Sequence, residues 1–444
     1  MSVSTDTAGV SPPATEEHRR KAKKATAVAA FGTFIEYYDF SVYGYVAATL
    51  AIVFFPSDNP TVGLLNTFLV FGSAFAVRPL GALFFGRLGD RAGRRVSLIA
   101  SIGLMSLAAA LTGLLPGYAS IGVAAPILLI ILRMLQGFST GGEIGGAASY
   151  IREWAPKERR SLYISFIPGV AVFGKACAAG MAALAATLIP ESAMESWGWR
   201  IPFLLAVPLG LLCLYLRLKI EDTPEFRDTQ SADRSARPDR KPFKELMADY
   251  PGPLGKVMAI STVQNVGTYV GTVFVASYLS SVLDFSEGEA ATIVLLAVLA
   301  AAVFIPLCGQ FGSRVGGKRV LIVSYIAYVA LTIPSFWLMG RGSVGLAIAG
   351  LLLGMIPYAL CQAGTYAAMP EFFPVQVRHT GVAFGHSVGA VIGGGAGPYA
   401  STWLIDSTGS TLVPAYILVF FGLFGLAVVL GLMRPSASRD HLYA

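Results

Sequence analysis

The chain has 444 residues, of which 55% are hydrophobic and only 13% are charged. A water-soluble protein carries about 25% charged residues, so most of this exterior must face lipid and a soluble globular protein is excluded. The net charge of +7 could suggest nucleic-acid binding, but the positions of the charges, given below, favour a membrane protein.

The first 24 residues are polar and end in a run of Lys and Arg. The apolar segment that follows, at about 25–55, is too long for a signal-peptide core and is expected to be the first membrane span. Each later segment can supply the roughly 20 apolar residues that a membrane-spanning helix needs. These segments lie near 64–86, 96–116, 121–150, 161–189 and 200–219, and, after a polar interval, near 255–282, 290–311, 320–339, 343–368, 378–405 and 412–433.

We therefore expect an all-α polytopic membrane protein with twelve transmembrane helices in two pseudo-symmetric six-helix bundles. The N-terminal bundle should occupy 25–220 and the C-terminal bundle 255–433. A cytoplasmic tail at 1–24, a central loop at 221–254 and a short tail at 434–444 complete the expected organisation.

Lys and Arg concentrate on alternate connections between these segments. One set contains Arg87 to Arg95, Arg152 to Arg160 and the central loop, whereas the other set holds almost no Lys or Arg apart from Arg341 and Arg200. The positive-inside rule then places both termini and the central loop in the cytoplasm of a cell with a cytoplasmic (inner) membrane.

The sequence also repeats itself. The stretch Gly86–Arg95 recurs in weaker form as Gly309–Lys318, at the equivalent connection of each half. Two related six-helix halves are typical of transporters that rock about a central site.

Several motifs carry a family resemblance that covers nearly the whole chain. Gly86–Arg95 resembles the loop motif between helices 2 and 3 of the major facilitator superfamily, and Arg133–Gly137 is similar to its second motif. Other stretches are similar to the metabolite:proton symporter branch, which includes shikimate, 2-oxoglutarate, citrate and proline/betaine carriers. These stretches are Glu36–Gly44, Arg78–Gly81, Gln136–Glu143, Trp197–Phe203 and Glu221–Phe226.

The resemblance implies a proton-coupled symporter that works by alternating access, and no enzyme. It also implies a conformational latch between cytoplasmic helix ends, expected at Gly86, Gly89, Asp90, Arg91, Gly93, Arg94, Arg95, Glu143 and Arg314. Ser313 stands where the first-half loop has Asp90, so an acidic latch is expected in one half only. Only ten residues follow Arg434, whereas osmosensing proline/betaine carriers often have a longer C-terminal coiled coil, which disfavours that substrate.

Ionisable groups inside membrane spans are rare and are functional candidates by default. Glu36 and Asp39 on helix 1 are candidates for the proton site, with His386 on helix 11 as a third. Asp39 could instead form a structural ion pair with Arg133 on helix 4. The polar face of helix 4 also contains Gln136.

Lys175 lies in the middle of helix 5, too deep for its ammonium to reach the membrane surface. It either pairs with Glu36 or Asp39 or binds an anionic substrate. The expected substrate-binding set is Arg78, Arg133, Gln136, Lys175 and Tyr43 from the first half, with Asn265, Tyr269, Tyr358 and Gln362 as neutral contacts from the second half.

Together these features predict proton-coupled uptake of a small organic anion, such as a mono- or dicarboxylate or a shikimate-like acid, by a monomer in the lipid bilayer. The alternatives are uptake of a zwitterionic osmolyte (proline or betaine), or an exporter or antiporter of the same fold. No cofactor, metal or nucleic acid is expected, because the four cysteines fall in apolar segments without paired spacing and the glycine-rich loop lacks the context of a nucleotide cradle.

Overall fold

The computed structural model describes residues 16–92, 94–141, 143, 160–219, 242–373 and 375–432, and all regular structure within them is helical. The first half contains α1 (Glu16–Tyr45), α2 (Ala47–Phe54), α3 (Pro60–Ala76), α4 (Arg78–Ala92), α5 (Arg94–Leu114), α6 (Tyr118–Ile121), α7 (Ala124–Thr140), α9 (Arg160–Leu188), α10 (Glu191–Ala193), η2 (Met194–Gly198) and α11 (Arg200–Leu218). The second half contains α13 (Pro242–Asp249), α14 (Pro251–Thr268), η4 (Tyr269–Phe274), α15 (Val275–Ser281), α16 (Glu287–Val315), α17 (Gly317–Met339), α18 (Val344–Ala368), η5 (Met369–Phe372), α19 (Val375–Ala390), η6 (Val391–Gly395), α20 (Ala396–Thr408) and α21 (Val413–Leu432).

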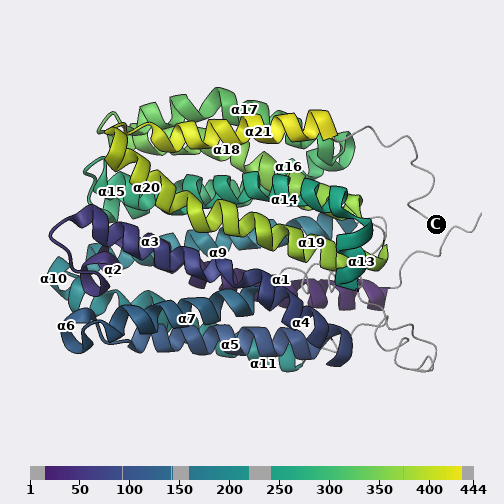
Figure 1. Cartoon of the computed structure of the whole chain (residues 1–444), viewed down its shortest axis with the longest axis horizontal. Coiled ribbons are helices and arrows are strands. Elements are labelled where there is room, and N and C mark those ends of the chain that lie inside the picture. Colours follow the sequence, from purple (N-terminus) through teal and green to yellow (C-terminus); the bar gives the residue numbers. More distant parts are fainter. Residues whose placement is uncertain are drawn as a thin grey trace, which may run out of the picture.

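The helices form two bundles whose members run along the long axis of the molecule (Figure 1). The first half fills the lower part of that view and the second half the upper part. The halves meet where α9 packs against α16 and α18, and where α3 packs against η6 and α20. The fold is that of an all-α polytopic membrane protein, as the apolar segments predicted.

Eight helical segments of the described chain are long and apolar enough to cross a membrane. The remaining long segments, which are α1, α7, α14 with α15, and α19 with α20, are shorter or more polar than that standard. These four segments carry Glu36, Arg133, Asn265 and His386. Polar groups lower the hydropathy of a span, and they are tolerated where they face the bundle interior.

Apolar side chains cover the outside of the bundles. Leu69, Leu188, Val303 and Phe420 are each more than 60% exposed. A surface of this kind suits lipid tails and would be unstable in water.

The ends of the expected segments differ in detail. α1 begins at Glu16, inside the expected N-terminal tail, and α13 and α14 both begin before residue 254, inside the expected central loop. Residues 220–241 and 434–444 lie outside the described chain. The start of α1 and the helix α13 lie at one end of the bundles, whereas α2, α6, α10 and α15 lie at the other (Figure 1).

A glycine-rich stretch after α19 interrupts the α-helix. η6 is a π-helical turn between α19 and α20, and such turns often mark functional sites. A Cβ on Gly394 would lie 2.7 Å from the Tyr269 ring and 2.8 Å from the Phe75 ring. Only glycine therefore permits this close contact of η6 with η4 and α3.

Candidate functional site

Asp39 and Arg133 belong to one buried cluster, but they do not form the direct ion pair considered above. The amide of Gln136 lies between them, donating from Nε2 to Asp39 Oδ2 at 2.7 Å and accepting from Arg133 NH1 at 2.6 Å. The guanidinium also lies 3.8 Å from the centre of the Tyr43 ring, and the Tyr43 hydroxyl donates to the carbonyl of Thr67 at 3.0 Å. Tyr43 thus supports Arg133, and its hydroxyl is occupied.

Lys175 lies in a different place, enclosed by aromatic rings from both halves. Its ammonium is 5.2 Å from the ring centre of Tyr37 and 5.7 Å from those of Tyr269 and Tyr358. It also donates a hydrogen bond to the Tyr358 hydroxyl at 3.2 Å. We call Tyr37, Tyr269 and Tyr358 the tyrosine cage. Lys175 forms no ion pair with Glu36 or Asp39, so that alternative is not realised in this conformation.

Arg78 connects the cage to the carboxyl groups of α1. Its guanidinium lies over the rings of both Phe40 and Phe75, at 4.3 and 4.4 Å from their centres. Arg78 interacts electrostatically with Glu36 and with Lys175. Glu36 is fully buried, and neither of its carboxylate oxygens has a hydrogen-bond partner within the described part of the chain. A buried carboxyl group without partners is far more stable as the neutral acid than as the anion.

A row of aromatic groups crosses from α1 to α19. The hydroxyls of Tyr37 and Tyr366 are 3.4 Å apart, and the Tyr366 ring centre is 6.0 Å from that of His386. His386 is buried, and its Nε2 has no hydrogen-bond partner among the described residues. His386 therefore lies beside Tyr366, which also interacts electrostatically with Glu36.

The neutral polar groups of the second half bond to one another. Gln264 donates to Gln362 at 2.7 Å, Gln362 donates to Thr268 at 2.9 Å, and Asn265 donates to Gln264 at 3.0 Å. Of these side chains, Asn265 and Gln362 were expected to contact the solute. In this conformation they form a closed network behind Tyr358 that holds α14 against α18.

A buried salt bridge between Glu143 and Arg217 lies one turn of α1 away from Glu36. The sequence indicated Glu143 as a candidate but not Arg217. Arg217 donates through both terminal nitrogens to the Glu143 carboxylate and also to the carbonyl of Leu98 at 2.6 Å. A Cβ on Gly32 would collide with this pair, so the pair packs directly on α1. Glu36 interacts electrostatically with both partners. Arg217 occurs in the last turn of α11, at the expected cytoplasmic end, where a basic residue is common and does not indicate a buried site. In the structure, however, Arg217 is completely buried.

Breaking this salt bridge is expected to destabilise the protein strongly. Glu143→Gln leaves the Arg217 guanidinium buried without its counter-charge, which should cost about 3–5 kcal/mol of unfolding free energy. The double variant Glu143→Leu with Arg217→Met removes both charges and should recover most of that loss. Thermal unfolding of the purified variants in detergent measures both effects, and equal melting temperatures for Glu143→Gln and wild type would contradict the structural importance of the pair.

The expected latch loops are described only in part. Gly93 lies outside the described residues, as do the side chains of Gly89, Asp90, Arg91 and Arg94. Arg95 donates to the carbonyl of Leu218 and so connects α5 to the end of α11. Gly86 lies within α4, and Arg314 is exposed at the end of α16. No group of three potential metal ligands occurs in the described part of the chain.

Comparisons with known proteins agree on one family. The model of the Major Facilitator Superfamily matches residues 29–385 and 257–442. The chain is 35% identical to the proline/betaine transporter of Salmonella typhimurium over 429 residues, which covers 94% of this chain and 85% of that protein. It is 34% identical to the ectoine/proline transporter ProP of Corynebacterium glutamicum over 452 residues, covering 99% of this chain and 88% of the relative. Among solved structures, the proton:xylose symporter XylE bound to 6-bromo-6-deoxy-D-glucose superposes with a TM-score of 0.75 at 17% identity, covering 93% of this chain and 95% of that one.

Proposed function

This chain belongs to the Major Facilitator Superfamily, and we propose that it imports a small zwitterionic osmolyte of the proline and betaine class together with protons. The organic anion expected from the sequence gives way to the alternative considered there, because the relatives named above carry proline, betaine or ectoine. The length of the C-terminal tail argued against this class, but it has no bearing on the groups that would contact a solute.

The tyrosine cage with Lys175 is the observation that carries the proposal. A zwitterion of this class has a carboxylate and an onium or ammonium group only a few bonds apart. Lys175 and Arg78 are two cations that interact electrostatically with each other, and both suit the carboxylate of the solute. The cage already surrounds a cation, the Lys175 ammonium, and aromatic faces bind quaternary ammonium groups well. If the carboxylate of the solute attracted the Lys175 ammonium out of the tyrosine cage, the onium group of the solute could occupy the cage in its place.

Glu36 is the proposed proton site. It interacts electrostatically with Arg78 and with both members of the Glu143–Arg217 salt bridge. Loss of its proton would place a new negative charge beside both, attracting Arg78 away from the solute and Arg217 away from Glu143. Proton release and rearrangement of the salt bridge would then occur together, which is what coupling requires.

We also propose that the end of the bundles with α13 and the start of α1 faces the cytoplasm, with both termini there, because the Lys and Arg residues concentrate in the connections at that end.

One observation still favours an organic anion as the second candidate. Apart from the Glu143–Arg217 salt bridge, the buried charged groups of the described residues are the cations Arg78, Arg133 and Lys175 and the carboxyl groups Glu36 and Asp39. If Glu36 is protonated, a solute with a net negative charge would restore neutrality better than a zwitterion does.

Membrane potential separates the two candidates. Entry of a zwitterion with one proton carries one positive charge, which is worth about 2.3 kcal/mol per 100 mV and supports roughly 50-fold accumulation. Entry of a monoanion with one proton is electroneutral. The test is uptake of radiolabelled glycine betaine, proline, shikimate and 2-oxoglutarate into proteoliposomes, with a potassium diffusion potential and a pH gradient imposed separately.

Accumulation of betaine or proline that either gradient drives, and that an uncoupler abolishes, supports the proposal. Uptake of an acid that responds to the pH gradient alone would replace it by the second candidate. Accumulation of neither class would contradict both.

A further inference from the structure

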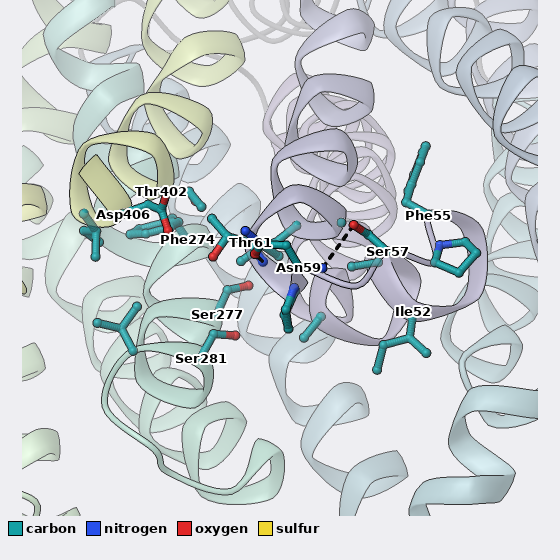
Figure 2. Close-up of a pocket in the computed structure, with 18 of the residues that line it drawn as sticks. Ile52, Phe55, Ser57, Asn59, Thr61, Phe274, Ser277, Ser281, Thr402 and Asp406 are labelled. Atoms are coloured by element: carbon teal, nitrogen blue, oxygen red, sulfur yellow. Dashed lines mark hydrogen bonds between the residues drawn. The ribbon is translucent and has the colours of Figure 1, made fainter. Parts of the chain in front are cut away.

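A large cavity lies away from the buried cluster, at the end of the bundles opposite α13. It has a volume of about 680 Å³, and none of the residues expected to bind the solute lines it. One wall comes from the first half through α2 and the start of α3, and the other from the second half through η4, α15 and α20. Figure 2 shows Thr402 and Asp406 on one side, with Ile52, Phe55 and Ser57 across from them.

The lining of the cavity contains a single formal charge, the carboxylate of Asp406. Asp406 is exposed and makes no hydrogen bond or ion pair with the described part of the chain. The rings of Phe55 and Phe274 and a set of serine and threonine hydroxyls complete the lining, which contains no Lys or Arg. An uncompensated carboxylate beside aromatic rings attracts an organic cation and repels an anion.

The connections at this end reinforce that preference. Asp58, Asp284 and Glu287 lie in or next to them, whereas their basic residues are Arg200 and Arg341. Charge of one sign around a concave, partly apolar site raises the local concentration of solutes of the opposite sign.

We propose that this cavity is an outer recognition site for the onium or ammonium end of the incoming solute, with Asp406 as its charged contact. The inference rests on the proposed function for the identity of the solute. Because each half supplies one wall, rocking of the halves changes the cavity, so a solute held there by its cationic end can pass inward with its carboxylate toward Lys175. Simple organic anions lack the group that the cavity binds.

Thiol labelling tests the cavity without relying on transport. Ser281 is exposed on the α15 wall, whereas Cys213, Cys308 and Cys361 are buried and Cys177 is half-buried outside the cavity. In Ser281→Cys, a trimethylammonium thiosulfonate should react faster than a sulfonate thiosulfonate, each rate being taken relative to a free thiol. Wild type measures the background. Asp406→Asn should lower the ratio of cationic to anionic rates roughly fivefold, and tetramethylammonium, but not acetate, should protect the thiol in the presence of Asp406.

Asp58→Asn is the matched control, because it removes the same charge from the same end of the molecule outside the cavity lining. An equal fall in the ratio for Asp58→Asn and Asp406→Asn would make the preference a property of the whole surface and overturn the site. A ratio equal to that of a free thiol would overturn it as well.

Transport kinetics distinguish the two proposals from each other. If glycine betaine is transported, Asp406→Asn should raise its KM about fivefold and leave kcat unchanged. An unchanged KM would remove the cavity from the transport pathway. Labelling that favours cations while no osmolyte is transported would instead leave the site standing and reject the proposed solute.

Discussion

Lys175→Met is expected to raise the KM for glycine betaine at least 100-fold. The variant keeps the length and apolar stem of the side chain but removes the ammonium enclosed by Tyr37, Tyr269 and Tyr358. A charge-assisted contact made inside a buried site contributes several kcal/mol, and each 1.4 kcal/mol corresponds to a tenfold change in affinity. Initial rates of uptake into proteoliposomes at increasing solute concentration measure the effect.

Stability separates a binding role for Lys175 from a structural one. Lys175 is completely buried and forms no ion pair with Glu36 or Asp39. Removing a buried charge that has no ion-pair partner among the described residues should therefore leave the melting temperature unchanged or raise it. A structural partner would show the opposite result, a lower melting temperature with an unchanged KM.

Lys219→Met serves as the matched control. Lys219 follows α11 at the surface, and its ammonium contacts only the Tyr215 side chain of the same helix among the described residues. The same loss of charge at this position should change neither KM nor stability. A comparable rise of KM in Lys219→Met would mean that the overall charge, and no specific contact, controls uptake.

The overall architecture could be predicted from the sequence because its determinants are local. The length and hydropathy of each segment reveal spanning helices, and the motifs indicated the family that the comparisons establish.

The contacts within the site could not be predicted, because they join residues far apart in the sequence. Gln136 stands between Asp39 and Arg133, where a direct ion pair had been considered. Arg217 pairs with Glu143, 74 positions away in the sequence. Tyr37 belongs to the tyrosine cage, although the sequence indicated only its neighbours Glu36 and Asp39 on this helix as candidates. Helical periodicity assigns residues to faces, but it does not determine which helices those faces meet.

Glu36→Gln is expected to abolish uphill accumulation of the solute while preserving exchange of labelled for unlabelled solute. Glutamine resembles the neutral acid in shape and polarity, and among the described residues Glu36 has no hydrogen-bond partner that the change would disturb. The variant should therefore behave as a permanently protonated carrier. It can bind and exchange the solute, but it cannot return empty after releasing a proton, so accumulation should fall from roughly 50-fold to none.

Counterflow and gradient-driven uptake in the same proteoliposomes measure the two activities separately. Robust counterflow without accumulation is the expected pattern. Retention of accumulation by Glu36→Gln would exclude this residue as the proton site.

Asp39→Asn distinguishes the two carboxyl groups that the sequence left as alternatives. Asp39 accepts a hydrogen bond from Gln136, which in turn accepts one from Arg133. Its neutralisation should leave Arg133 without a nearby counter-charge and lower the melting temperature, because an uncompensated buried charge is costly. Glu36→Gln should leave stability intact. If Asp39→Asn instead abolishes accumulation and spares both counterflow and stability, the proton resides on Asp39, and the Gln136 amide would be the group that responds to its charge.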